Sequence, residues 1–152
     1  MDRIIFADAG AFIALGDDND VYHQKAFATY HLLVTSGAAL VTTNHVVDET
    51  CTLLLRTGPN GYQLALRFGR TIERAKIYDG TGYPKRGDSG LIIFYSTPEI
   101  ERRAWDIFRR YDTAKLSYTD CVSFAVMQML SLTEAFTFDS HFDMLGFQRL
   151  PV

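Results

Sequence analysis

Residues 3–15 of this 152-residue chain read RIIFADAGAFIAL, and this stretch sets the fold class. Its first part is a short apolar run with the length of a buried strand, and the run ends directly at Asp8. The residues from 9 to 15 then favour a helix. The chain therefore opens as a strand, an acid and a helix.

The same alternation continues to the end of the chain. Further strands are predicted at residues 38–42, 91–95, 135–138 and 147–150, and further helices at 21–34, from 44 to about 58, 62–74, 97–111 and 117–132. Asn44 is the expected cap of the third helix, and the glycine-rich residues 79–90 are expected to form an exposed loop or hairpin. Strands alternating with helices predict a mainly parallel sheet in a three-layer α/β/α fold.

Length and composition bound the organisation of the chain. Apolar residues make up 47% of the sequence, which is enough for one cooperative core, so a single domain over residues 1–152 is expected. No apolar run approaches the ~18 residues that a membrane span needs, and the Met1-Asp2-Arg3 start is unlike a signal peptide. A cytoplasmic protein without a membrane partner is the expectation, with Cys51 and Cys121 as reduced core thiols.

Charge is divided unevenly along the chain. Residues 56–115 hold twelve of the fifteen Lys and Arg but only seven of the eighteen acids, a net charge of +5, whereas the remainder carries −8. A solvated surface accounts for this division equally well. The functional interpretation is a polyanion along the basic segment and cations held by acids elsewhere.

Two acids directly follow predicted strands. Asp8 ends the first apolar run, and Asp139 follows the run at 135–138. Ligands of open parallel sheets bind at the carboxyl ends of the strands, which is where both acids are expected. The alternative for each is a cap of the following helix.

Two more acids sit at the margins of apolar helices. Asp120 begins a helix that has no charged residue from 121 to 132, so its carboxylate is expected at the mouth of the core, with a capping box to Ser117 as the alternative. Glu49 flanks the apolar stripe of its helix, whereas Asp48 points toward solvent. A boundary position paired with His45 is the alternative for Glu49.

Four acids at one sheet edge would repel each other unless cations lay among them. Mg²⁺ or Mn²⁺ prefers such oxygen ligands and can activate a water for attack on a phosphodiester. The acids Asp8, Glu49, Asp120 and Asp139 therefore predict metal-dependent phosphodiester hydrolysis.

These residues, in this order, resemble the motifs of the PIN-domain family, especially its VapC-type toxins. The resemblance covers nearly the whole chain and is carried by residues 5–11, 42–49, 116–120 and 135–139. It assigns the four matched acids to metal binding, with Asp143 as a candidate outer ligand or a solvated acid. It implies a PIN-like fold and a ribonuclease without a protein nucleophile.

The resemblance also implies partners. They are an RNA substrate, a cognate antitoxin received in a groove to which the helix at 21–34 contributes, and a second copy of the chain in a homodimer. The alternatives are a housekeeping RNA-processing nuclease and a non-catalytic PIN relative. A receiver domain and a haloacid-dehalogenase-like phosphatase are disfavoured, since Asp8 has no paired acid and Gly10 stands two residues after it.

The basic segment supplies candidates for RNA binding. Arg67, Arg70 and Arg74 have the spacing of one helical face, so they are predicted to contact the RNA backbone. The same spacing suits a solvated helix surface.

Overall fold

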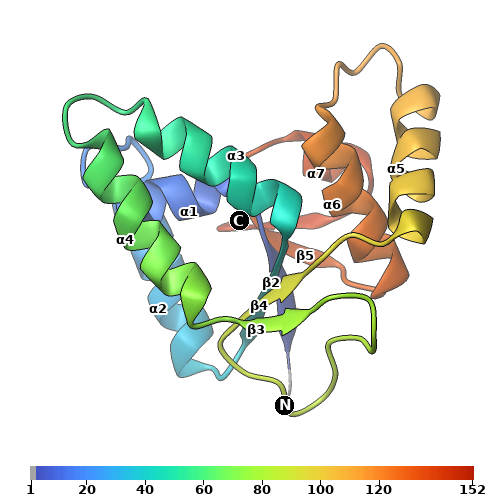
Figure 1. Cartoon of the computed structure of the whole chain (residues 1–152), viewed down its shortest axis with the longest axis horizontal. Coiled ribbons are helices and arrows are strands. Elements are labelled where there is room, and N and C mark those ends of the chain that lie inside the picture. Colours follow the sequence, from blue (N-terminus) through green and yellow to red (C-terminus); the bar gives the residue numbers. More distant parts are fainter. Residues whose placement is uncertain (1–2) are drawn as a thin grey trace.

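The computed structural model describes residues 3–152 and has a six-stranded sheet in the order β3-β4-β2-β1-β5-β6 (Figure 1). Every strand pair is parallel. The strands are β1 (Ile4–Ala7), β2 (Ala39–Thr43), β3 (Lys76–Tyr78), β4 (Leu91–Phe94), β5 (Glu134–Phe136) and β6 (Gln148–Leu150). Met1 and Asp2, part of the predicted leaderless start, lie outside the described residues.

The helices cover both sides of the sheet, which confirms the predicted three-layer α/β/α fold (Figure 1). In the figure α2 and α4 lie to one side of the strands, and α5 and α6 lie to the other. The helices are α1 (Ala9–Gly16), α2 (His23–Thr35), α3 (Asn44–Leu55), α4 (Gly61–Glu73), α5 (Pro98–Arg110), α6 (Tyr118–Met129) and α7 (His141–Met144).

The strand order reverses at β1, and this fixes where a ligand would bind. In the sheet β2, β4 and β3 lie on one side of β1, and β5 and β6, which come later in the chain, lie on the other. A ligand is therefore expected at the carboxyl ends of β1 and β5, the usual binding place in an open parallel sheet. Ile5, Phe6 and Ala7 are completely buried, as expected for a central strand covered on both faces.

Helix α6 is buried along most of its length, as its uncharged sequence predicts. All residues from Asp120 to Met127 are buried. Ser117 caps the helix, because its hydroxyl accepts from the backbone N–H of Asp120 at 3.0 Å while the Asp120 carboxylate accepts from the Ser117 N–H at 3.2 Å. This capping box holds Asp120 at the edge of the core.

Strand β3 was not predicted, and the hairpin alternative for residues 79–90 is wrong. β3 pairs in parallel with β4, so residues 79–90 form a loop that returns across the sheet. The strand has three residues at an exposed edge, and such a stretch carries no apolar run to detect. Asp88 fastens the loop by accepting from Lys76 at 2.7 Å and from the Tyr78 hydroxyl at 2.5 Å.

The cap of α3 is a second correction. The Thr43 hydroxyl, not Asn44, accepts from the N–H of Val46 at 3.1 Å. Asn44 instead accepts from the backbone N–H of Ser96 at 2.9 Å and so joins α3 to the turn before α5.

Within residues 3–152 no helix is both long and apolar enough to cross a bilayer.

Candidate active site

The four predicted acids meet at the carboxyl edge of the sheet. Asp8 follows β1, Asp139 follows β5, Glu49 lies in α3 and Asp120 lies in the first turn of α6. The four lie close enough for their charges to interact. The charges of Asp120 and Glu49 raise the pKa of Asp8, and those of Asp120 and Asp139 raise the pKa of Glu49. Asp48, next to Glu49, is exposed, as the helical periodicity predicts.

Asp8 is the most deeply buried of the four acids. Asp8 occupies the N-cap position of α1, as the cap alternative predicts, but its side chain makes no capping hydrogen bond. Burial raises the pKa of Asp8 to about 7, and the charges of Asp120 and Glu49 add to that effect. The hydroxyl of Thr137 opposes it by donating to Oδ2 of Asp8 at 3.0 Å.

Burial and charge repulsion also raise the pKa values of Asp120 and Glu49. Burial raises the pKa of Asp120, and the charge of Asp139 raises it further. Burial raises the pKa of Glu49, to which Asp120 and Asp139 add. Three carboxylates are thus held where ionisation is costly, and a cation among them would remove that cost.

His141 joins this group and was not predicted. Its Nδ1 lies 3.1 Å from Oδ1 of Asp139 and 3.9 Å from Oδ2 of Asp120, and it is buried without a hydrogen-bond partner among the described residues. One ligand atom from each of these three residues lies within 4.8 Å of the others. The Asp-x-His spacing after a strand was the sequence signal, since it places the imidazole only two residues after Asp139.

The donor set fits a divalent cation. Carboxylate oxygens suit Mg²⁺ and Mn²⁺, and an additional imidazole nitrogen favours Mn²⁺ over Mg²⁺. The observations that support this fit are the buried Nδ1 of His141, which makes no hydrogen bond among the described residues, and the raised pKa values of Asp8, Glu49 and Asp120. Asp8, Glu49, Asp120, Asp139 and His141 are the residues that could hold such an ion.

A polar network beside the acids joins three helices. Nε2 of His45 lies 3.0 Å from Oε1 of Glu101 and 3.2 Å from Oγ of Ser96, and Tyr118 donates to the other oxygen of Glu101. His45 therefore pairs with Glu101, not with Glu49 as the boundary alternative required. The network fixes the starts of α3 and α6, which carry Glu49 and Asp120.

Asp143, the candidate outer ligand, forms an ion pair with Arg149. Its carboxylate lies 2.9 Å from Arg149 and is half exposed. It is not part of the three-residue group that includes Asp139. A ligand role for Asp143 stays a prediction.

The three arginines of the predicted RNA-binding face lie in or at the end of α4, and Arg67 and Arg70 line different grooves. Arg67 lines a pocket together with Ala38 and Gly90, which directly precede β2 and β4 at the amino edge of the sheet. Arg70 lines a separate groove between α3 and α4, and Arg74 ends α4 shortly before β3 begins. Their contact with RNA stays a prediction.

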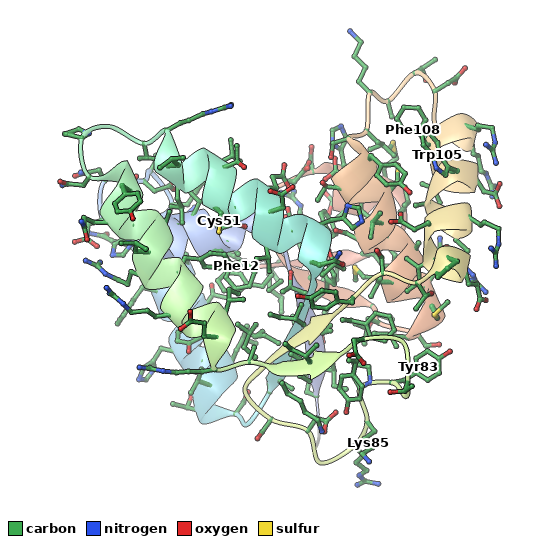
Figure 2. The ribbon with its side chains drawn as sticks, viewed as in Figure 1. Phe12, Cys51, Tyr83, Lys85, Trp105 and Phe108 are labelled. Carbon is green, nitrogen blue, oxygen red and sulfur yellow. The ribbon has the colours of Figure 1, made fainter. Side chains whose placement is uncertain are left out.

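The pocket that Arg67 lines is mainly apolar. It encloses about 340 Å³ between α1, α2, α4 and the amino ends of β2 and β4. Aromatic side chains from three helices form much of its wall, and Phe27 and Tyr30 are 59% and 40% exposed beside it. Phe12, on the inner wall, is labelled in Figure 2.

Comparison with known proteins gives the same assignment over almost the whole chain. The PIN domain family model matches residues 5–148. The chain is 31% identical over 144 residues to the 23S rRNA-specific endonuclease VapC20 of Mycobacterium tuberculosis, covering 95% of both proteins. It is 29% identical over 140 residues to a VapC ribonuclease of Archaeoglobus fulgidus, covering 90% of this chain and 78% of that protein.

A solved structure agrees with these relatives. The crystal structure of the M. tuberculosis VapC20, described as a sarcin-ricin loop cleaving toxin, matches with a TM-score of 0.73 at 30% identity and covers 94% of this chain and 95% of the other. The structural match, the acids at the carboxyl edge and the family match lead to one conclusion. The chain belongs to the PIN-domain family, and within it to the relatives of the VapC ribonucleases.

Proposed function

We propose that this protein is a divalent-metal-dependent endoribonuclease that hydrolyses RNA phosphodiester bonds as the toxin of a type II toxin-antitoxin pair. The convergence of Asp8, Glu49, Asp120 and Asp139 carries the proposal. Burial and mutual repulsion make the charges of the first three costly without a cation. VapC20 is named for cleavage of 23S rRNA at the sarcin-ricin loop, so that loop is the first RNA to test.

The side chains around the acids prepare the site for an ion. Thr137 orients the Asp8 carboxylate, and the capping box with Ser117 fixes the direction of Asp120. The backbone N–H of His141 donates to Oδ1 of Asp139 at 2.9 Å and holds that carboxylate at the end of β5. Mg²⁺ or Mn²⁺ bound by these acids would lower the pKa of a bound water and neutralise charge on the phosphate.

The test compares two adjacent carboxylates of α3. Glu49→Gln removes a charge from the proposed site, and Asp48→Asn removes an exposed charge next to it. We expect Glu49→Gln and Asp120→Asn to abolish cleavage of a sarcin-ricin loop RNA in Mg²⁺ or Mn²⁺, with circular dichroism unchanged. Asp48→Asn should cleave like wild type. Full activity of either site variant would remove that acid from the proposed site.

The apolar pocket between α1, α2 and α4 is the proposed place of the antitoxin. Its aromatic wall suits an apolar protein segment, and Arg67 at its margin suits an acid on that segment. Coexpression with the cognate antitoxin should yield a complex that Phe27→Asp and Tyr30→Asp disrupt without loss of RNA cleavage by the free enzyme. The homodimer stays a prediction, which light scattering of the free protein would test.

A further inference from the structure

Two aromatic rings stack beside the acid cluster. The ring of Tyr22, just before α2, lies 4.3 Å from that of Phe138 at an interplanar angle of 7°. Phe138 directly precedes Asp139 in the chain, so the stacked pair lies beside one acid of the proposed catalytic site. Tyr22 is 43% exposed. Its hydroxyl makes no hydrogen bond within residues 3–152, so no polar contact accounts for its position.

The stack forms one wall of a groove. The groove encloses about 610 Å³ between α2 and β6, and Lys25 and Arg149 line it together with both rings. Arg149 also reaches the carbonyl of Phe138 at 3.4 Å while it pairs with Asp143. Lys25 is exposed and forms no ion pair within the described part of the chain. An aromatic surface and two cations therefore lie next to the acids.

This combination points to a nucleobase rather than to an apolar peptide. Proteins that bind single-stranded RNA combine stacked aromatic side chains with cations that follow the backbone. Arg149 already pairs with Asp143, but an apolar peptide would leave Lys25 without a partner in the groove, whereas a phosphate would pair with it. The position directly before Asp139 would put such a base next to the phosphodiester that is cleaved.

We propose that Tyr22, supported from behind by Phe138, stacks a nucleobase flanking the cleaved bond, and that Lys25 and Arg149 contact the adjoining phosphates. The proposal rests on the proposed ribonuclease function and assigns it a substrate-binding position. Tyr22 then determines how RNA is placed, so its loss should act mainly on RNA affinity and KM.

The test uses short RNAs with one base removed. Single-stranded RNAs of the cleaved sequence, each with an abasic nucleotide at a different position, are bound to Asp120→Asn protein with and without Tyr22→Ala. We expect Tyr22→Ala to weaken binding of intact RNA about tenfold, as expected for one lost base stack. In the protein that keeps Tyr22, an abasic nucleotide at one flanking position should weaken RNA binding by a similar factor. In the Tyr22→Ala protein the same abasic nucleotide should not change RNA binding.

Two further variants complete the design. Tyr22→Phe keeps the ring and should bind RNA normally, whereas Tyr62→Ala removes another exposed tyrosine, 61% exposed on α4, as the matched control. Equal sensitivity of both proteins to every abasic position would overturn the proposal. So would a Tyr22→Ala protein that loses antitoxin binding but keeps RNA affinity. Wild-type protein that cleaves no RNA would instead refute the proposed function.

Discussion

The hydroxyl of Thr137 donates a 3.0 Å hydrogen bond to Oδ2 of Asp8, and this bond joins the carboxyl ends of β1 and β5. The hydroxyl oxygen of Thr137 also accepts a hydrogen bond from the backbone N–H of Asp139 at 3.1 Å. One buried threonine therefore sets the positions of two acids that lie 131 residues apart in the chain. It also favours the ionised form of Asp8, which a metal site requires.

Replacement of this hydroxyl should affect both stability and chemistry. Thr137→Val keeps the shape but is expected to lower the free energy of unfolding by about 1–2 kcal/mol and to weaken metal-dependent cleavage, most strongly at low pH. Thr42→Val is the control, because Thr42 is also buried but donates to the carbonyl of Ala7 at 2.8 Å. Urea titrations and pH profiles of cleavage should separate the two variants. Identical pH profiles would deny Thr137 a role in tuning Asp8.

The stability of the metal-free protein should fall as pH rises. Asp8 has an ordinary pKa of 3.8 when unfolded and about 7 when folded. The folded state therefore binds this proton more tightly, and the resulting stabilisation is complete below about pH 4 and lost as pH rises through 7. We expect Asp8→Asn to flatten this decline in chelator between pH 4 and 8. Parallel profiles for the two proteins would contradict the raised pKa.

Metal should stabilise the native protein through the acids. Saturating Mn²⁺ or Mg²⁺ is expected to raise the melting temperature of wild type by several degrees, since a ligand of the native state stabilises it by mass action. An Asp8→Asn, Asp139→Asn variant should show little shift. Calcium should stabilise wild type but support little cleavage, because its larger coordination sphere positions the attacking water poorly. Equal shifts in both proteins would contradict a shared site.

Much of the fold and of the acid cluster follows from local sequence patterns. Buried central strands such as β1 are continuous apolar runs, and an acid that directly follows one stands out, as Asp8 does. Glu49 could be separated from Asp48 because helical periodicity alone distinguishes their directions. Each of these predictions depended on residues within one element.

The features that were missed depend on contacts between distant elements. The three-residue edge strand β3 exists because it pairs with β4, and no run of apolar residues marks it. His141 lies near Asp120 of another helix, and Glu101 pairs with His45 of another helix, so these contacts cannot be inferred from neighbours in the sequence. The spacing of Arg67, Arg70 and Arg74 predicted one helical face, but Arg67 and Arg70 line different grooves, and only the topology places Arg67 near the amino edge of the sheet.

Glu101 should support the site without belonging to it. Burial raises the pKa of Glu101, but hydrogen bonds from Tyr118 and His45 outweigh that effect and lower it overall. Glu101→Gln should loosen the starts of α3 and α6, lower stability by roughly 1 kcal/mol and weaken metal affinity. Glu99→Gln is the matched control, since Glu99 is exposed on the same helix. Metal titrations that do not distinguish the two variants would reduce Glu101 to a residue of general stability.

The arginines of α4 should matter only for long substrates. Helix α4 runs toward the amino edge of the sheet, so a strand cut at the acids must extend past the site to reach Arg67, Arg70 and Arg74. In an Asp120→Asn background, Arg67→Ala, Arg70→Ala, Arg74→Ala should weaken binding of a long RNA and reduce its log-log salt slope by ~0.7 for each lost phosphate contact. Binding of a short RNA confined to the acid site should not change. If the salt slope for long RNA stays the same, these arginines face solvent or a protein partner, and the phosphate path must lie elsewhere on the basic segment.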